Sequence, residues 1–530
     1  MNAYLQKRRR FLRNSVWSGL AACGPLALAG CGSGGGGASS AALDASGNAP
    51  PDEAKVRAAI DQIDAMVGAL MQKSGLPGMA VAVVRGDQTV YARGFGNRVA
   101  GSASPVDADT VFQLASMSKS IGASAVAYQV GLGGIAWDTP VQKHLPWFEL
   151  KDPAVNPQLT IGDLYSHRSG LPEHAGDRLE DIGYDQRQVL ERLRFLPLGP
   201  FRKSYNYTNF GLTAGAAAVA VAAGTDWATL CDRALYVPLG MTRTSSRFAD
   251  FQTRSNRVIG HVKANGVYVP GPVRMPDAQA PAASVSSSVN DVARWLSMMV
   301  GQGVFAGKTI VDASALAPAV SPQYMTAPAT DGRAASYYGF GFNVGTTAAN
   351  RASFGHSGAF ALGTGTAFTV VPSTGLGMVA LTNAAPIGVP ETLIAQFFDL
   401  VQFGSIQQPW SEIYTRAFLP FAAPEGSLVG VAPPTQPVPA KGLSAYIGTY
   451  GNAYHGPLRV VQESGGLMLV LGATPLRLPL AHWDGDVFTF TLVSENAEPG
   501  TISKASFASD RVTLEYYDRD RLGTFVRAGA

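Results

Sequence analysis

Ser116 and Lys119 are the two residues of this chain best suited to covalent chemistry. They stand three residues apart in Ser116-Met117-Ser118-Lys119, ahead of an apolar run, and side chains at this spacing share one face of a helix. A serine hydroxyl becomes a nucleophile when a neighbouring base takes its proton, and a desolvated lysine can do so. The helix N-terminus adds N–H groups where an oxyanion would develop. A chain of this length is expected to contain so short a pattern by chance, so its weight depends on further residues.

Tyr207-Thr208-Asn209 is the second pattern with chemical potential. A tyrosine that shares its proton with an ammonium can pass that proton from the serine to a leaving group. An asparagine two residues later can bind both the lysine and a substrate carbonyl. Tyr450-Gly451-Asn452 matches the same pattern in the C-terminal part, and a purely structural role for Tyr207 remains an alternative.

The third pattern is Gly355-His356-Ser357-Gly358, just before a predicted hairpin. His356 is placed to orient a substrate or to assist proton transfer. Gly358 lets a substrate lie close to the strand, and the Ala359 N–H is predicted to form an oxyanion hole with the Ser116 N–H.

Two competing interpretations concern the histidines. His174-Ala175-Gly176 matches the same short pattern as His356 but is predicted to lie in a loop, and His356 itself could be structural. The seven histidines are scattered, without a His-x-x-x-His pair, so neither a metal nor a cofactor is expected.

Hydrophobic periodicity predicts the elements that position these residues. Helices are predicted at 53–73, 117–130, 210–223 and 391–402, and strands at 79–84, 89–94, 365–371 and 376–383. This order favours an α/β domain in which an antiparallel sheet is flanked by helices.

The first thirty residues are predicted to be an export signal. A basic region of twin-arginine type, Lys7–Arg13, precedes the apolar stretch Val16–Ala29, which is too short for a permanent membrane helix. It ends in Leu28-Ala29-Gly30-Cys31, which resembles a bacterial lipobox whose cysteine is lipidated. We therefore expect a periplasmic protein of the bacterial cell envelope, anchored to the membrane by lipid at Cys31.

Two alternatives to this signal stay open, namely cleavage at the weaker site Leu20-Ala21-Ala22-Cys23 and an uncleaved membrane anchor. The signal also explains the positive net charge. It carries five of the 41 basic residues and none of the 38 acidic ones, so the rest of the chain has a net charge of −2. No nucleic-acid partner is therefore expected. After lipidation at Cys31 only Cys231 would remain, which rules out an intramolecular disulfide.

The chain is too long for one ordinary domain, and its composition, 46% hydrophobic and 15% charged, is that of a globular protein. The C-terminal part changes to short strands at regular spacing, which predicts a small β-barrel or sandwich. The predicted parts are a signal peptide (1–30), a flexible tether (31–52), a catalytic domain (53–407), a linker (408–441) and a C-terminal β-barrel (442–530).

Taken together, these motifs resemble those of the serine β-lactamase-related superfamily. This superfamily includes class C β-lactamases, family VIII carboxylesterases, D-aminopeptidases and DD-peptidases. The segments Leu159–Pro172, Pro238–Thr242 and Tyr338–Phe342 are also similar to segments of that family. The resemblance implies an α/β domain with an antiparallel sheet, together with an all-helical lobe. It makes Ser116 the acylated nucleophile, with Lys119 and Tyr207 handling its proton.

One departure from the family pattern concerns the third motif. Class C β-lactamases and DD-peptidases commonly carry Lys-Thr-Gly where this chain has His356-Ser357-Gly358. The missing cation weakens the case for binding a substrate carboxylate there. The histidine form is similar to D-aminopeptidases, and the C-terminal strands look like the lipocalin-like module of some of these peptidases.

The sequence thus predicts an exported serine hydrolase that cleaves an amide or peptide bond through an acyl-enzyme on Ser116. Its partners would be a small peptide, amide or ester substrate and, through the lipid, a membrane. Carboxylesterase or β-lactamase activity at the same site is one alternative, and a non-catalytic penicillin-binding sensor is another.

Overall fold

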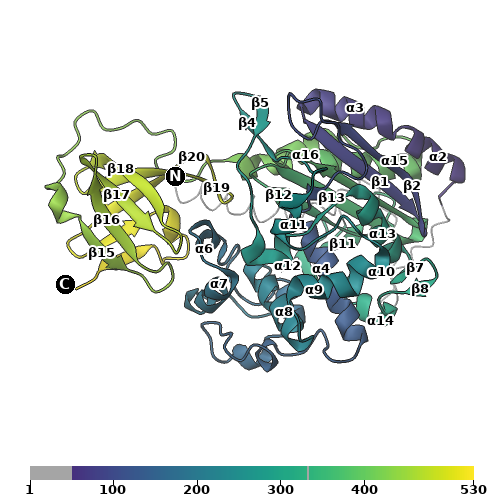
Figure 1. Ribbon diagram of the computed structural model, residues 1–530, viewed down its shortest axis with the longest axis horizontal. Helices are drawn as coiled ribbons and strands as arrows, with labels where there is room; N and C mark the ends of the chain where they lie inside the picture. The colour runs from purple at the N-terminus through teal and green to yellow at the C-terminus, as the bar shows by residue number, and fades with distance from the viewer. Residues whose placement is uncertain (1–50, 331–333, 530) are drawn as a thin grey trace. The chain divides into compact units, whose positions relative to one another are not determined.

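The centre of the fold is an eight-stranded antiparallel sheet, seen in a computed structural model that describes residues 51–330 and 334–529. The strand order is β2-β1-β14-β13-β12-β11-β10-β9. Figure 1 labels β2, β1, β13, β12 and β11 of this sheet. The strands are β1 (Gly78–Arg85), β2 (Gln88–Gly96), β9 (Tyr324–Ala327), β10 (Ser336–Tyr338), β11 (Asn343–Thr346), β12 (Ala352–Phe360), β13 (Thr364–Val371) and β14 (Leu376–Thr382). The predicted hairpins β1–β2 and β13–β14 are confirmed, and they meet where Met79 pairs with Thr382.

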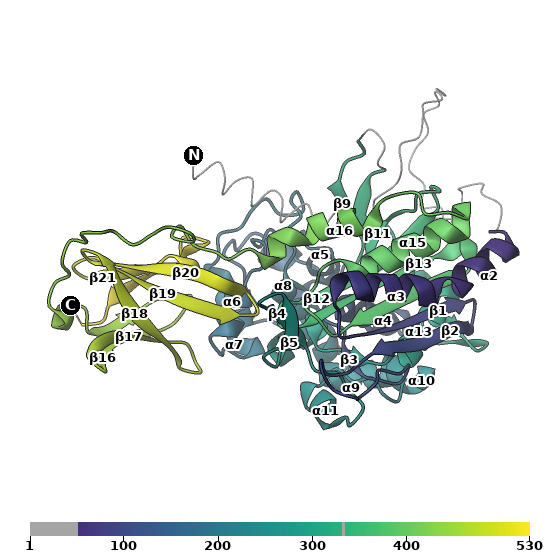
Figure 2. The same cartoon turned by 90° about the horizontal axis from the view of Figure 1, so that it is seen from above.

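Helices cover both faces of this sheet (Figure 2). α2 (Glu53–Asp61), α3 (Ile63–Ser74) and α15 (Val389–Phe403) pack together on one face. α4 (Met117–Gly131) and α13 (Val289–Val300) pack on the other. Because side chains alternate along a strand, each strand supplies residues to both layers. The predicted fold class is therefore confirmed for this part of the chain.

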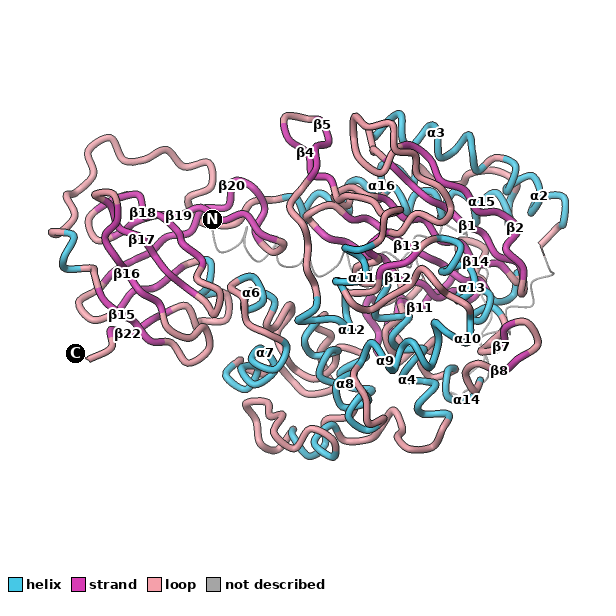
Figure 3. The backbone as a smooth tube through the Cα atoms, in the orientation of Figure 1, coloured by secondary structure: helices cyan, strands magenta, loops and turns pink. Residues whose placement is uncertain are grey.

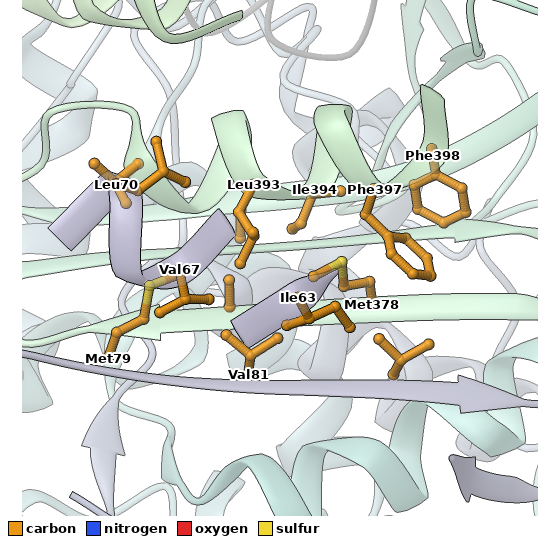
Figure 4. Packing of buried hydrophobic residues seen from close by; sticks show 14 of the residues in the cluster. Ile63, Val67, Leu70, Met79, Val81, Met378, Leu393, Ile394, Phe397 and Phe398 are labelled. Carbon is orange, nitrogen blue, oxygen red and sulfur yellow. The ribbon is translucent and has the colours of Figure 1, made fainter. Parts of the chain in front are cut away.

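The α2/α3/α15 layer is held by a large apolar cluster (Figure 4). Ile63 and Val67 of α3 pack against Met79 and Val81 of β1, and Phe397 of α15 is fully buried in the same cluster. The predicted helix 53–73 is present but interrupted at Gln62, so it forms α2 and α3. It ends as expected at Gly75, whose φ of 75° is the left-handed conformation common after a helix.

The same part of the chain contains further short elements. They are β3 (Phe112–Gln113), α5 (Ile161–Tyr165), α9 (Trp227–Cys231), α10 (Val237–Leu239), α11 (Phe248–Thr253), α12 (Ala280–Ala283), α14 (Ala313–Leu316) and the hairpin β4 (His261–Ala264) with β5 (Val267–Pro270). Of these, α9, α12 and α14 contact α4. Cys231 is buried and not in a disulfide.

The predicted linker 408–441 needs a correction at its start. Residues Trp410–Phe418 form helix α16, and Trp410, Tyr414 and Phe418 are buried in a small cluster against α15. Their spacing of four residues places them on one helix face. This helix was not predicted because the segment is rich in proline. The first compact unit accordingly extends to Phe421.

The second compact unit has a composition that the sequence did not predict. Besides the chain from Ala422 onward it includes Pro140–Thr160 and His167–Ala214 from the middle of the sequence. Its inserted segments carry α6 (Asp177–Asp181), α7 (Gln186–Arg192) and the first residues of α8 (Asn209–Ala222), drawn cyan in Figure 3. The boundary predicted at 407–442 therefore describes only part of the division.

The C-terminal part of that unit is a closed eight-stranded barrel, which confirms the predicted β-barrel. Its strands are β15 (Gly448–Gly451), β16 (Leu458–Glu463), β17 (Gly466–Leu471), β18 (Leu476–Asp484), β19 (Val487–Ser494), β20 (Ala497–Phe507), β21 (Arg511–Leu514) and β22 (Thr524–Arg527). Tyr450 is buried in β15 and its hydroxyl donates to the Tyr446 carbonyl, so this tyrosine has a structural role.

The predicted export signal, Cys31 and most of the tether lie outside the described residues. Between residues 51 and 529, no single described helix is long and apolar enough to cross a membrane. One bent pair, Asn209–Ala222 with Trp227–Leu239, meets the test by length and composition only.

Phe397→Ala tests the packing of α15. Removing a fully buried phenyl ring is expected to lower the free energy of unfolding by about 3–5 kcal/mol. Ile406→Ala, at a position that is 45% exposed, should change it by less than about 0.5 kcal/mol. Chemical denaturation followed by tryptophan fluorescence measures both values, and equal stability of the two variants would refute the described packing.

Candidate active site

Ser116 lies at a tight junction between β3 and helix α4. It caps the helix, and the preceding residue, Ala115, is buried with a left-handed φ of 48°. A non-glycine residue in this conformation costs on the order of 1 kcal/mol, and such strain is found most often at functional sites. The turn brings the hydroxyl of Ser116 to the first turn of the helix. The N–H groups of Met117, Ser118 and Lys119 in that turn donate to the carbonyls of Leu114, Ala115 and Ser116.

The predicted meeting of serine and lysine is present. Lys119 Nζ lies 3.0 Å from Ser116 Oγ and 3.0 Å from the carbonyl oxygen of Ala282 in α12. The Lys119 side chain is fully buried. Burial makes a charge on this amine costly, and the two oxygens compensate part of that cost. The arrangement is suited to moving a proton between the hydroxyl and the amine.

The first turn of α4 is fixed by contacts with two other segments. Ser118 Oγ accepts a hydrogen bond from the Val285 N–H at 3.0 Å, and Ser120 Oγ donates to the Gly341 carbonyl at 2.6 Å. Gly341 has a φ of 80°, and a Cβ there would lie 2.7 Å from the Lys119 carbonyl oxygen. Glycine is therefore required for the segment Tyr338–Phe342 to pack on the lysine-bearing turn.

The strand that carries the third motif lies directly against the serine. A Cβ on Gly358 would lie 2.2 Å from the Leu114 carbonyl oxygen and 3.1 Å from the Ser116 nitrogen. Thr366 Oγ1 of the neighbouring strand donates to the same Leu114 carbonyl at 2.9 Å. Only glycine permits this approach, which the predicted oxyanion pair of Ser116 and Ala359 N–H groups would need.

The strand β12 is paired on both sides over only part of its length. The register of β11 on β12 runs from Ala352 to Gly355 and stops there. Among the described strands, residues 356–360 consequently pair with β13 only.

His356 is buried, and it lies on this strand with both ring nitrogens engaged. Nδ1 lies 2.6 Å from the Ser357 carbonyl oxygen and Nε2 lies 2.8 Å from the Tyr338 hydroxyl. Since a carbonyl only accepts, Nδ1 carries the proton and Nε2 accepts from Tyr338. Burial, with a smaller contribution from the charge of Lys119, lowers the pKa of His356 to about 3. The ring is thus neutral at neutral pH, and the part of His356 in orienting a substrate or assisting proton transfer stays a prediction from the sequence.

Ser357 belongs to the opposite layer. The Ser357 side chain donates a hydrogen bond to the carboxyl group of Glu391, in the first turn of α15. Burial raises the pKa of Glu391 to about 7. A pocket lies on this α15 side of the sheet and is lined by both residues and by Asp399 and Trp410. His356 also lines this pocket, whereas Ser116 does not.

Tyr207 and Asn209 lie in the second unit. Tyr207 is buried, its ring lies 4.5 Å from that of His167, and its carbonyl accepts from the His174 N–H at 2.8 Å. Asn209 is the first residue of α8, and its Nδ2 donates to Asp177 Oδ2 at 3.0 Å. The roles of Tyr207 and Asn209 in proton transfer and substrate binding remain predictions from the sequence.

Two residues with contacts to the motifs were missed by sequence reasoning. Asp177 binds Asn209, and Glu391 binds Ser357. The spacing of three residues between His174 and Asp177 could have predicted that the two side chains meet. His174-Ala175-Gly176 forms a turn before α6, in agreement with the predicted loop. Glu391 gave no signal beyond a charge in a helix that is otherwise apolar.

Comparison with known proteins identifies the class. Residues 63–397 match the family model described as Beta-lactamase, and residues 432–519 match the domain of unknown function DUF3471. The first match covers more than half of the chain, so the chain belongs to the Beta-lactamase family. It is an enzyme of the serine hydrolase superfamily that the motifs predicted.

Individual relatives are hydrolases and penicillin-binding proteins. The chain is 25% identical over 481 residues to the unguisins hydrolase ungD of Aspergillus violaceofuscus, with 82% of each chain covered. It is 30% identical over 345 residues to penicillin-binding protein 4 of Amycolatopsis lactamdurans, covering 62% of this chain and 86% of the relative. It is also 33% identical over 197 residues to esterase EstB of Burkholderia gladioli, covering 34% and 50%.

A solved structure has the same fold. The octameric penicillin-binding protein homologue from Pyrococcus abyssi aligns with a TM-score of 0.57 and 18% identity. The alignment covers 86% of this chain and 98% of that one. At this identity the likeness concerns the fold alone.

Glu391→Gln tests the buried carboxyl behind the third motif. Because burial raises the pKa of Glu391 from 4.5 to about 7, the folded state holds a proton that the unfolded state releases. Stability should therefore fall by about 3 kcal/mol as pH rises from about 4.5 to about 7, and then level off. The glutamine variant lacks this contribution, so its advantage over wild type should appear above pH 7 and vanish below about pH 4.5. Denaturation at a series of pH values measures it, and parallel curves would contradict the burial of this acid.

Proposed function

We propose that this protein is an exported, lipid-anchored hydrolase that cleaves amide or peptide bonds through an acyl-enzyme on Ser116, in the manner of a D-aminopeptidase. The observation that carries the proposal is the 3.0 Å contact between Ser116 Oγ and the buried Lys119 amine, beside the Gly358 backbone.

The reaction begins when Ser116 Oγ attacks the substrate carbonyl carbon. The serine proton passes to Lys119 and Tyr207, and the carbonyl oxygen becomes an oxyanion bound by the N–H groups of Ser116 and Ala359. The carbon–nitrogen bond then breaks, and the leaving amine takes its proton from Tyr207. Water attacks the acyl-enzyme and gives one proton to the same pair of residues. The pair returns this proton to Ser116 Oγ as the ester bond breaks, which releases the acid and the free serine.

Three features support an amide or peptide substrate. The third motif presents the neutral His356 where a lysine would bind a carboxylate, which disfavours substrates recognised through a carboxylate there. One relative is a hydrolase of unguisins, and the histidine form of the motif is similar to D-aminopeptidases. The likeness to esterase EstB supports carboxylesterase activity as the second candidate, and β-lactamase activity is the third.

Ser116→Ala tests the nucleophile. The purified chain from Ala38 onward would be assayed on D- and L-aminoacyl anilides, a short-chain nitrophenyl ester and a chromogenic cephalosporin. Loss of the serine is expected to lower kcat/KM on the best substrate by about 1,000-fold or more. Ser124→Ala, which removes another buried hydroxyl of α4, is the matched control and should retain turnover. Equal activity of Ser116→Ala and wild type would exclude the mechanism, and the preferred substrate decides between peptidase, esterase and lactamase.

Cys31→Ser tests the lipid anchor. If the cysteine is lipidated, wild-type protein made in a bacterial host should be found in the membrane fraction and incorporate labelled fatty acid. The serine variant should incorporate none and leave the membrane fraction. Unchanged fractionation together with an unlabelled wild type would refute lipidation at this residue.

A further inference from the structure

We propose that Asp177 is a positioning residue that fixes the orientation of the Asn209 side-chain amide, and that the C-terminal barrel holds Asp177 in place. This inference rests on the proposed role of Asn209 as a contact for substrate and lysine. It also gives the barrel a part in the reaction, although none of its own residues would touch the substrate.

Asp177 is a buried carboxylate with an unusual set of partners. It is only 3% exposed, and its Oδ2 accepts from Asn209 Nδ2 at 3.0 Å and from His174 Nδ1 at 2.9 Å. Its other oxygen, Oδ1, is buried and has no hydrogen-bond partner among the described residues. An unpaired buried oxygen costs stability, so packing alone does not explain a carboxylate at this position.

What a carboxylate provides is a fixed direction of hydrogen bonding. An ionised aspartate only accepts, so the Asn209 amide must turn its NH₂ group toward Asp177. The carbonyl oxygen of Asn209 then points the other way, as an acceptor for the lysine ammonium, and the second N–H of the amide is left to donate to a substrate carbonyl. An amide at position 177 could donate as well as accept, and Asn209 could then turn over and present its NH₂ group instead.

His174 restricts the carboxylate from the same turn. It has a left-handed φ of 58°, and Gly176, with a φ of 91°, completes the turn into α6. This turn places the His174 imidazole in contact with Asp177, the residue three positions further along the chain. The carboxylate is therefore held from two sides, by His174 and by Asn209.

The barrel holds the helix that bears Asp177. α6 has five residues, too few to be stable alone. Asn496, in the turn between β19 and β20, donates to the Asp177 carbonyl at 3.3 Å and to Asp181 Oδ2 at 3.1 Å. Ser494 Oγ, at the end of β19, donates to Asp181 Oδ2 at 2.7 Å.

Arg178 makes a further link between α6 and the chain from Ala422 onward. Its guanidinium lies 2.7 Å from Glu425 Oε2 and stacks over the ring of Tyr516, 3.9 Å from the ring centre. The next turn adds a bond from the Tyr184 hydroxyl to the His455 carbonyl at 3.0 Å. Both ends of α6 are thus fixed to the barrel, and Asp177 lies at its start.

A double-mutant cycle between positions 177 and 209 tests the proposal. Asp177→Asn should lower kcat/KM on the best substrate by about 10- to 100-fold. In an Asn209→Ala background the same change should have less than about a 2-fold effect, because Asp177 would act only through Asn209. Equal factors in both backgrounds, or no loss in the single variant, would overturn the proposal.

A second readout does not depend on activity. The Asn209 side-chain NH₂ resonances, assigned by their absence in Asn209→Ala, should exchange slowly with solvent in wild type. They should lose this protection in Asp177→Asn at an unchanged melting temperature, and retained protection would refute the contact. If wild type turned over none of the substrates, the proposed function would fail while this NMR result still decided the role of Asp177.

The contribution of the barrel is measured with Asn496→Ala. Removing this amide should lower kcat/KM by about 3- to 10-fold, with little further effect when Asp177→Asn is already present. Val493→Ala, at a residue 63% exposed close to the same turn, is the matched control and should be indistinguishable from wild type. A rate for Asn496→Ala equal to that of Val493→Ala would show that the barrel does not act through α6.

Discussion

The burial of the Lys119 amine beside Ser116 is the constraint on which the part of the candidate site around α4 depends. A buried amine needs oxygen partners, and Ser116 Oγ and the Ala282 carbonyl supply them. The strained turn at Ala115 and the requirement for glycine at 341 follow from placing that amine and that hydroxyl at the first turn of one helix. The positive charge of Lys119 adds to the effect of burial in lowering the pKa of His356, so the histidine of the third motif is neutral.

Local patterns in the sequence were sufficient to predict most elements of the fold. The hairpins β1–β2 and β13–β14, the helices α4, α8 and α15, and the C-terminal barrel all follow from periodicity and turn residues. The pair Ser116 and Lys119 could be predicted as a contact because helical geometry fixes it. α16 was missed because Pro409 and the later prolines made the segment look like a linker.

Long-range packing could not be read from such patterns. The grouping of His167–Ala214 with the chain from Ala422 onward depends on individual polar contacts, such as Arg178 with Glu425, that leave no periodic trace. The tautomer and charge of a buried histidine likewise depend on the groups around its ring. Burial keeps the ring of His356 neutral and the Tyr338 hydroxyl donates to its Nε2, while its expected part in orienting a substrate or assisting proton transfer stays a prediction. The contact between Tyr338 and His356 depends on the pairing of strands, which the sequence pattern does not specify.

The central claim is that Ser116 forms a covalent acyl intermediate. The most direct measurement is intact mass spectrometry after rapid acid quench of the enzyme with a short-chain nitrophenyl ester, followed by mapping of the modified peptide. We expect a mass increase of one acyl group on the peptide that contains Ser116, absent when Lys119 is replaced by methionine. An adduct on another residue, or steady turnover without any adduct on Ser116 at any quench time, would contradict the account.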